Sequence, residues 1–211
     1  MGASGWDYMV PFGGSLEESL LAVQESVLAS GDFVWPWEQL DFGGLLNDGD
    51  EDEALPRPSS LQELSAAKEY DEFWEEGTHT ILDMDRVIAP DAEDHDGTVR
   101  PLSDQEILGL FSTLRPAVAE FDRIYQPGPA GPLAELMSRR WSARSLLIHD
   151  DEGAPVEVFF WGFSGDWAER DVARAGLPSR STDQPLAVGR PATATIRSPR
   201  GGVARCPCGA A

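Results

Sequence analysis

The sequence predicts an α+β domain, in which a small, mainly antiparallel sheet with a central hairpin at residues 144–163 packs against about five helices. Three observations predict this class. Ser-x-x-Glu capping boxes precede several amphipathic segments, and two apolar segments joined by a short turn form the hairpin. Strand and helix patterns also fail to alternate regularly, which disfavours a fully parallel sheet. We therefore expect one domain over residues 1–171.

Five segments have the pattern of helices. The first three begin at capping boxes, formed by Ser15 with Glu18, Ser60 with Glu63, and Ser103 with Glu106. Gly31 and Gly77 end the first two, because glycine is favoured just beyond a helix C-terminus. Pro116 opens the fourth helix, where the first turn tolerates proline. Apolar residues at helical spacing indicate the core-facing positions of the third, fourth and fifth helices, which are Ile107, Leu110, Phe111, Leu114, Val118, Phe121, Ile124, Leu133, Leu136, Met137 and Trp141.

Three regions have the pattern of β-strands. Residues 6–12 and residues 78–89 alternate apolar side chains with other residues, and the second region has Asp83 and Asp85 on its polar face. The hairpin has the strongest signal, because its two arms are separated by the turn sequence DEGAP. Both arms are apolar on both faces, so we expect the hairpin in the middle of the sheet with helices against it.

Two segments outside these patterns differ in composition. Residues 47–58 form an acidic loop that ends in two prolines. Residues 172–211 contain no aromatic residue and carry six arginines against one acid, which reverses the charge of the rest of the chain. So few large apolar side chains cannot offset the entropy of ordering the backbone, and this predicts a disordered basic tail. Out-of-frame translation is a second interpretation of this tail.

Four further sequence elements are GWDY at 5–8, EEGTHTILDMDR at 75–86, GTVRPLS at 97–103, and GAPVEVFFWGFSGD at 153–166 with its Phe-x-Gly-x-Ser-x-Asp spacing. Together they resemble the corresponding elements of a family of small, acidic, uncharacterised bacterial proteins. The resemblance covers residues 6–166. It implies a single α+β domain in the bacterial cytoplasm, and it implies no reaction, because no activity is assigned to the family.

The charge of the chain excludes several kinds of partner. Its formal net charge is −21, and residues 1–96 hold 24 acids against three bases. Nucleic acids and anionic membranes attract cationic proteins, so we expect neither as a partner. The sequence has no apolar stretch of transmembrane length and no recognisable signal sequence, which predicts a cytoplasmic protein. A basic protein is the partner that the charge favours.

No cofactor, metal or catalytic motif is complete in the sequence. Asp48, Asp50 and Asp52 match the first ligand positions of an EF-hand loop, but Glu53 and Ser59 stand where that loop needs glycine and glutamate. We therefore predict neither a metal nor a cofactor.

One incomplete group leaves an enzymatic alternative open. At strand spacing, His79, Asp83 and Asp85 share one face of the predicted 78–89 strand, and His149 lies at the end of a hairpin arm. An imidazole beside carboxylates suits general-base or metal-assisted hydrolysis. The alternative function is therefore a hydrolase, and a hydrogen-bonded structural role is the competing interpretation of these residues.

The leading hypothesis is a non-enzymatic interaction module of the immunity or antitoxin kind, which binds a basic partner. Trp35 and Trp37 are candidate contact residues, because tryptophan is enriched at binding hot spots. Asp48, Asp50 and Asp52 are candidate contacts because of their charge. Core burial is the competing interpretation of the tryptophans, and simple solubility is that of the acids.

Overall fold

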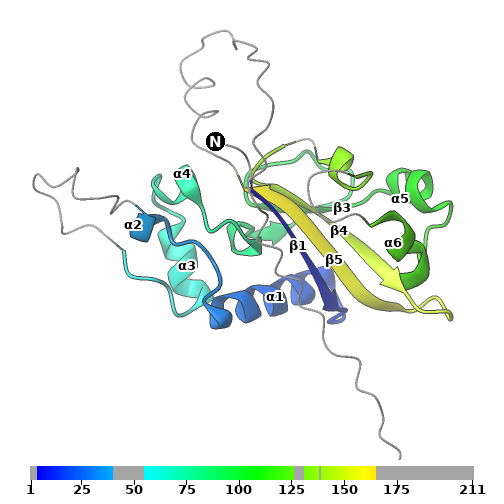
Figure 1. Ribbon diagram of the computed structural model, residues 1–211, viewed down its shortest axis with the longest axis horizontal. Coiled ribbons are helices and arrows are strands. Elements are labelled where there is room, and N and C mark those ends of the chain that lie inside the picture. The colour runs from blue at the N-terminus through cyan, green and yellow to red at the C-terminus, as the bar shows by residue number, and fades with distance from the viewer. Residues whose placement is uncertain (1–3, 40–54, 126–130, 138, 165–211) are drawn as a thin grey trace, which may run out of the picture.

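The computed structural model describes residues 4–39, 55–125, 131–137 and 139–164, and a five-stranded sheet lies at its centre (Figure 1). The strands are β1 (Ser4–Pro11), β2 (Arg86–Val87), β3 (Thr98–Pro101), β4 (Ser142–His149) and β5 (Pro155–Ser164). Their spatial order is β1-β5-β4-β3-β2. β5 runs antiparallel to both β1 and β4, whereas β2, β3 and β4 are parallel to one another. The sheet is therefore mixed, and the prediction of a mainly antiparallel sheet is wrong.

Two crossover connections produce the parallel half of the sheet. Residues 88–97 connect β2 to β3, and residues 102–141 connect β3 to β4. Parallel neighbours require such connections, whereas antiparallel neighbours need only a tight turn. β2 has two residues and β3 has four, so neither is long enough for period-two alternation to be visible in the sequence.

The strand predicted over residues 78–89 is wrong except at Arg86 and Val87. Residues Ile81–Asp83 form instead a 3₁₀ helix, η1, whose first turn is capped by Thr80. The Thr80 hydroxyl accepts a hydrogen bond from the Leu82 backbone N–H at 3.2 Å. A side chain that satisfies the backbone locally in this way competes with strand pairing.

The hairpin is confirmed, and it occupies the middle of the sheet between β1 and β3. Alternate β5 side chains enter two different cores. Val158 and Phe160 face one core, and Phe159 and Trp161 face the other. This arrangement explains why the arms of the hairpin are apolar on both faces.

Six α-helices in the described residues form two layers, one on each face of the sheet, rather than the five that the sequence predicted (Figure 1). The first layer contains α1 (Leu16–Ser30), α2 (Pro36–Gln39), α3 (Leu61–Ala67) and α4 (Phe73–Glu76). The second contains α5 (Asp104–Phe111), α6 (Val118–Ile124) and the 3₁₀ helix η2 (Ala134–Leu136). We call these the α1–α4 layer and the α5–α6 layer.

The predicted helix starts are confirmed where a cap defines them. Ser15, Ser60 and Ser103 each accept a hydrogen bond from the backbone N–H three residues later. Gly31 ends α1 in the left-handed conformation, with φ of 68°, which glycine adopts without the steric cost that a β-carbon brings.

Three details of the helix predictions are wrong. The helix expected from Ser60 to Gly77 is divided into α3 and α4, and the Lys68 carbonyl between them accepts a hydrogen bond from the Trp74 indole. The expected fifth helix is reduced to η2, and Trp141 directly precedes β4. Leu114, expected in the core, is 45% exposed because α5 already ends at Phe111.

Candidate functional site

An aromatic cluster connects the core of the α1–α4 layer to its surface. The Trp35 side chain is 1% exposed, and its indole N–H donates to the Leu55 carbonyl at 2.8 Å. The Trp37 ring centroid lies 4.9 Å from that of Trp35, and Tyr70 meets Trp37 edge-on at 6.3 Å. Tyr70 is 51% exposed. Trp35 is therefore a core residue, and Trp37 links it to the solvent-exposed ring of Tyr70.

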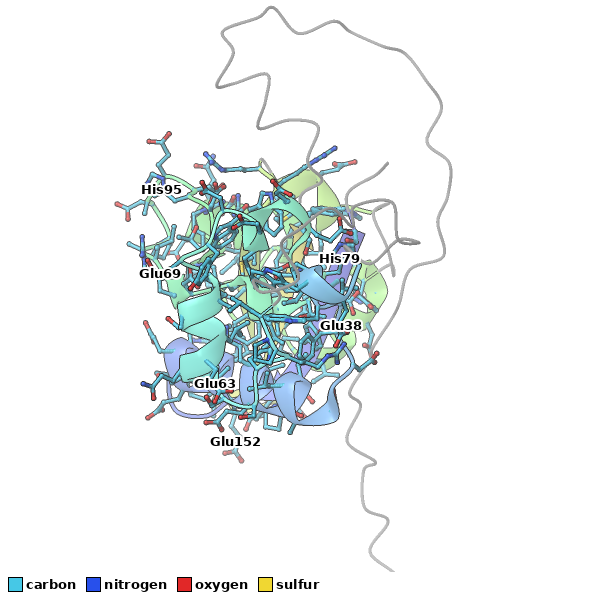
Figure 2. All side chains as sticks on the ribbon, turned by 90° about the vertical axis from the view of Figure 1, so that its left-hand side faces the viewer. Glu38, Glu63, Glu69, His79, His95 and Glu152 are labelled. Atoms are coloured by element: carbon cyan, nitrogen blue, oxygen red, sulfur yellow. The ribbon has the colours of Figure 1, made fainter. Side chains whose placement is uncertain are left out.

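The segments that build the α1–α4 layer carry many exposed carboxylates. We call them the acidic face. Its eleven members are Glu17, Glu18, Glu25, Asp32, Glu38, Glu63, Glu69, Asp71, Glu72, Glu75 and Asp85. Figure 2 looks onto this layer, with Glu38, Glu63 and Glu69 placed around its helices. Three acidic residues are immediate sequence neighbours of Tyr70 or lie two positions away, so the exposed ring is set among negative charge.

Two basic residues lie in the same layer, and both are bound within it. Arg57 forms an ion pair with Glu38 at 2.9 Å and also donates to the carbonyls of Gly31 and Phe33. Lys68 Nζ lies 2.6 Å from an Asp85 carboxylate oxygen, and its side chain is only 9% exposed. Among the described residues, no cation pairs with the acids that flank Tyr70.

Asp83, a member of the predicted hydrolytic group, is completely buried beneath the sheet. Its Oδ1 accepts hydrogen bonds from the Thr78 backbone N–H at 2.7 Å and from the Thr78 hydroxyl at 2.8 Å. Its Oδ2 accepts one from the Ser164 hydroxyl at 2.6 Å. Burial raises the pKa of Asp83 above its ordinary value, although these hydrogen bonds act in the opposite direction. The carboxyl group joins η1 to the end of β5.

The other residues of the predicted hydrolytic group do not converge on Asp83. His79 has a left-handed backbone with φ of 58°, and its Nε2 lies 3.0 Å from a Glu76 carboxylate oxygen. The Asp85 carboxylate is paired with Lys68. In the part of the chain that the structure describes, no group of three metal-ligating side chains is gathered.

His149 lies at the opposite end of the sheet. His149 is paired with Pro155, beside the hairpin turn. Asp83 contacts Ser164, which is at the other end of β5, next to the residue that pairs with Ser142. Ser142 and His149 are the first and last residues of β4, seven residue steps apart, which in extended strand is roughly 23 Å. The structure therefore does not bring His149 to His79.

Several predictions concern residues outside those that the structure describes. Asp48, Asp50 and Asp52 lie there, as does most of the acidic loop at residues 47–58. The basic tail at residues 172–211 also lies there. The proposed contact role of the three aspartates therefore stays a prediction, as does the disorder of the tail.

The sequence did not predict an ionic cluster that lies on the α5–α6 face of the sheet. Arg100 of β3 and Arg144 of β4 are paired in register. The Asp94 carboxylate accepts hydrogen bonds from both terminal nitrogens of Arg144, at 2.8 and 2.6 Å. The Glu106 carboxylate accepts hydrogen bonds from both terminal nitrogens of Arg100, at 3.0 and 2.8 Å. Arg100 lowers the pKa of Glu106 to about 2, with further hydrogen bonds from Ser103. The cluster lines an open groove of about 720 Å³.

Part of this cluster had a signal in the sequence. Glu106 is the glutamate of the capping box that opens α5, so its position was predicted, although its pairing with Arg100 was not. Asp94 and Arg144 are 50 residues apart, and only the tertiary structure brings them together.

Comparisons with protein-family models, with curated proteins and with solved structures found no match for this chain. The resemblance to a bacterial family therefore stays a prediction. Within the described residues, no helix has the length and hydrophobicity that crossing a bilayer requires.

Proposed function

We propose that this chain is a cytoplasmic, non-enzymatic interaction module that binds the basic surface of another protein through its acidic face. One observation carries the proposal. The face presents eleven exposed carboxylates, and the two basic residues of the same layer are already bound within it. Repulsion among so many like charges destabilises the isolated molecule, and a cationic partner surface would relieve it.

Tyr70 is the residue we expect at the centre of the contact. Its ring is half exposed and rests against Trp37, which in turn packs on the buried Trp35. A rigidly supported aromatic side chain loses little conformational entropy on binding, and tyrosine and tryptophan are enriched at hot spots. The face of such a ring also attracts arginine and lysine side chains. The surroundings of Tyr70 thus suit a basic side chain of the partner.

The geometry gives less support to the hydrolase alternative. A general base must reach its substrate, whereas Asp83 is completely buried and hydrogen-bonded on both oxygens. The Asp85 carboxylate is held by Lys68, and His149 lies at the far end of β4. The two aspartates instead connect separate segments of the fold, through the contact of Asp83 with Ser164 and that of Asp85 with Lys68.

The proposal can be tested by photo-crosslinking in a bacterial lysate. Tyr70 is replaced by p-benzoylphenylalanine, and Leu108 on α5, which is 47% exposed, is replaced in a matched control. We expect position 70 to capture a basic protein at about 0.05 M salt and to lose it at about 0.5 M, because salt screens exposed charges. Position 108 should not capture it.

A second pair of variants tests whether the position of the charge matters. The first combines Glu69→Gln, Asp71→Asn and Glu72→Gln beside Tyr70, and the control combines Asp122→Asn, Asp151→Asn and Glu152→Gln elsewhere on the surface. Both change the net charge equally. We expect about a tenfold loss of affinity for the captured partner in the first variant only, from several pair interactions of ~0.2–1 kcal/mol each. Equal losses in both, or capture of acidic proteins at position 70, would contradict the proposal.

A further inference from the structure

The two edges of the sheet differ greatly in length. One edge strand, β2, has two residues, whereas the other, β1, has eight (Figure 1). A short edge strand offers few backbone groups to another chain, but a long one presents a row of donors and acceptors. β1 pairs only with β5 among the described strands, so one side of β1 has no neighbouring strand.

The register of β1 and β5 identifies the backbone groups on the free side. The Phe12 N–H donates to the Val156 carbonyl at 2.9 Å, which makes these residues a hydrogen-bonded pair. Along an antiparallel ladder, hydrogen-bonded pairs alternate with pairs that are not hydrogen-bonded to each other. The even-numbered residues of β1 therefore direct their N–H and C=O groups toward β5. The N–H and C=O groups of Gly5, Asp7 and Met9 therefore point away from the sheet. Pro11, which has no N–H, also occupies an outward position.

We propose that the free edge of β1 accepts an extended strand from a basic partner protein, with a lysine or arginine of that strand opposite Asp7. Asp7 lies between Gly5 and Met9, the other two residues whose N–H groups point outward from the sheet edge. Its side chain is half-buried on the α5–α6 face. Its Oδ2 accepts a hydrogen bond from the Tyr125 hydroxyl at 3.0 Å, which fixes the position of the carboxyl group. Opposite charges on directly paired residues stabilise a sheet.

Charge also selects among the possible occupants of this edge. A second copy of the chain would bring a second formal charge of −21 to the interface. Pairing centred on Asp7 would also place two carboxyl groups directly opposite each other, which is destabilising. A basic strand has neither penalty. The inference depends on the proposed function only for the basic character of the partner, because the edge of β1 and the acidic face are different surfaces.

The test uses the full chain and an acetylated, amidated peptide of four Lys-Val repeats. A residue paired with Asp7 directs its own N–H toward β1, so the control peptide is N-methylated at the lysines, which keeps its charge but removes those donors. We expect the first peptide to slow amide hydrogen exchange at Gly5, Asp7 and Met9. The methylated peptide should bind at least roughly fivefold more weakly, which corresponds to about 1 kcal/mol.

Two substitutions in the chain sharpen the test. Met9→Pro removes an outward N–H without removing a hydrogen bond to β5, and Met9→Val is its matched control. We expect Met9→Pro to weaken the peptide roughly fivefold or more, and Met9→Val to change it less than about twofold. Asp7→Asn, which keeps an acceptor for Tyr125, should weaken it by about two- to fivefold and serves if Met9→Pro fails to fold.

The outcomes separate this inference from the proposed function. Peptide binding that leaves the exchange of Gly5, Asp7 and Met9 unchanged, or equal binding of the methylated peptide, would overturn the inference while leaving the acidic face untouched. Protection of these amides together with failed crosslinking at Tyr70 would support the inference and contradict the role of the acidic face. Concentration-dependent dimerisation that occupies β1 without peptide would also overturn it.

Discussion

The segments on the two sides of the sheet differ in how many basic residues accompany their acidic residues. Residues 15–39 and 55–85, which build the α1–α4 layer, contain thirteen acids and two basic residues. The described residues from 86 to 164 also contain thirteen acids, but seven basic residues. The number of acids is therefore the same, and the number of cations available to pair with them distinguishes the two regions.

The two regions also differ in the burial of their ion pairs. Arg144 is 1% exposed on its side chain and Asp94 is 11% exposed, so this ion pair of the second region lies against the sheet, whereas the pairs of Arg139 with Asp96 and of Arg123 with Glu120 are exposed. In the α1–α4 layer eleven carboxylates lie outside the aromatic core in contact with solvent, and Asp83 is buried. The buried pair of Arg144 and Asp94 contributes to folding. The exposed carboxylates of the first region contribute little to it, and those other than Glu38 and Asp85, which pair with Arg57 and Lys68, remain available for a partner.

The largest effect is expected from breaking the buried ion pair. Arg144→Ala removes the hydrogen bonds of 2.8 and 2.6 Å that the Asp94 carboxylate accepts, whereas the Arg100 contact to this carboxylate is longer, at 3.4 Å. Removing one partner of a buried pair costs about 3–5 kcal/mol in the free energy of unfolding, because the other charge stays buried. Arg123→Ala is the control, since Arg123 is 74% exposed and lies 3.9 Å from Glu120. It should cost less than about 0.5 kcal/mol. Urea denaturation measures the free energy of unfolding of both variants. Equal losses would show that the buried ion pair contributes no more to stability than the exposed one.

A smaller change in the free energy of unfolding is expected when the pH falls and Glu106 is protonated. Its folded pKa is about 2, below the ordinary 4.5, mainly because Arg100 binds its carboxylate. Its stabilisation is therefore complete above pH 4.5 and is lost as the pH falls toward 2. We expect this loss to be on the order of 2–3 kcal/mol. Glu106→Gln should be less stable at pH 7 and should show a flatter dependence in this window. An unchanged slope would show that Arg100 does not hold this carboxylate.

The smallest change in the free energy of unfolding is expected at Asp83, and its dependence on pH is opposite in sign to that of Glu106. Because burial raises its folded pKa above the ordinary 3.8, the folded chain binds this proton more tightly than the unfolded chain does. Its contribution to stability therefore increases as the pH falls through the raised pKa toward 3.8. Asp83→Asn keeps hydrogen-bonding groups for Thr78 and Ser164 without the charge. We expect it to be neutral or to stabilise by up to about 1 kcal/mol at pH 7, measured by thermal unfolding. A loss of several kcal/mol would show that the carboxylate itself is needed.

Local chemistry was sufficient where a feature depends on neighbouring residues. Ser15, Ser60 and Ser103 define helix starts through hydrogen bonds that span three residues, so their motifs are readable in the sequence. The hairpin was predictable because one short turn joins its arms. Period-two alternation failed over residues 78–89, because the Thr80 hydroxyl and the buried hydrogen bonds of Asp83 favour a 3₁₀ turn there.

The sequence by itself determined the acidic charge, the helix caps and the hairpin, because each follows from composition or from residues close together in the chain. Only the tertiary structure decided where the charge is neutralised and where it is left exposed. Arg144 meets Asp94 across 50 residues, and Asp83 meets Ser164 across 81, through contacts that local patterns do not encode. The parallel placement of β3 beside β4 likewise depends on a long crossover, and it is this placement that sets Arg100 beside Arg144.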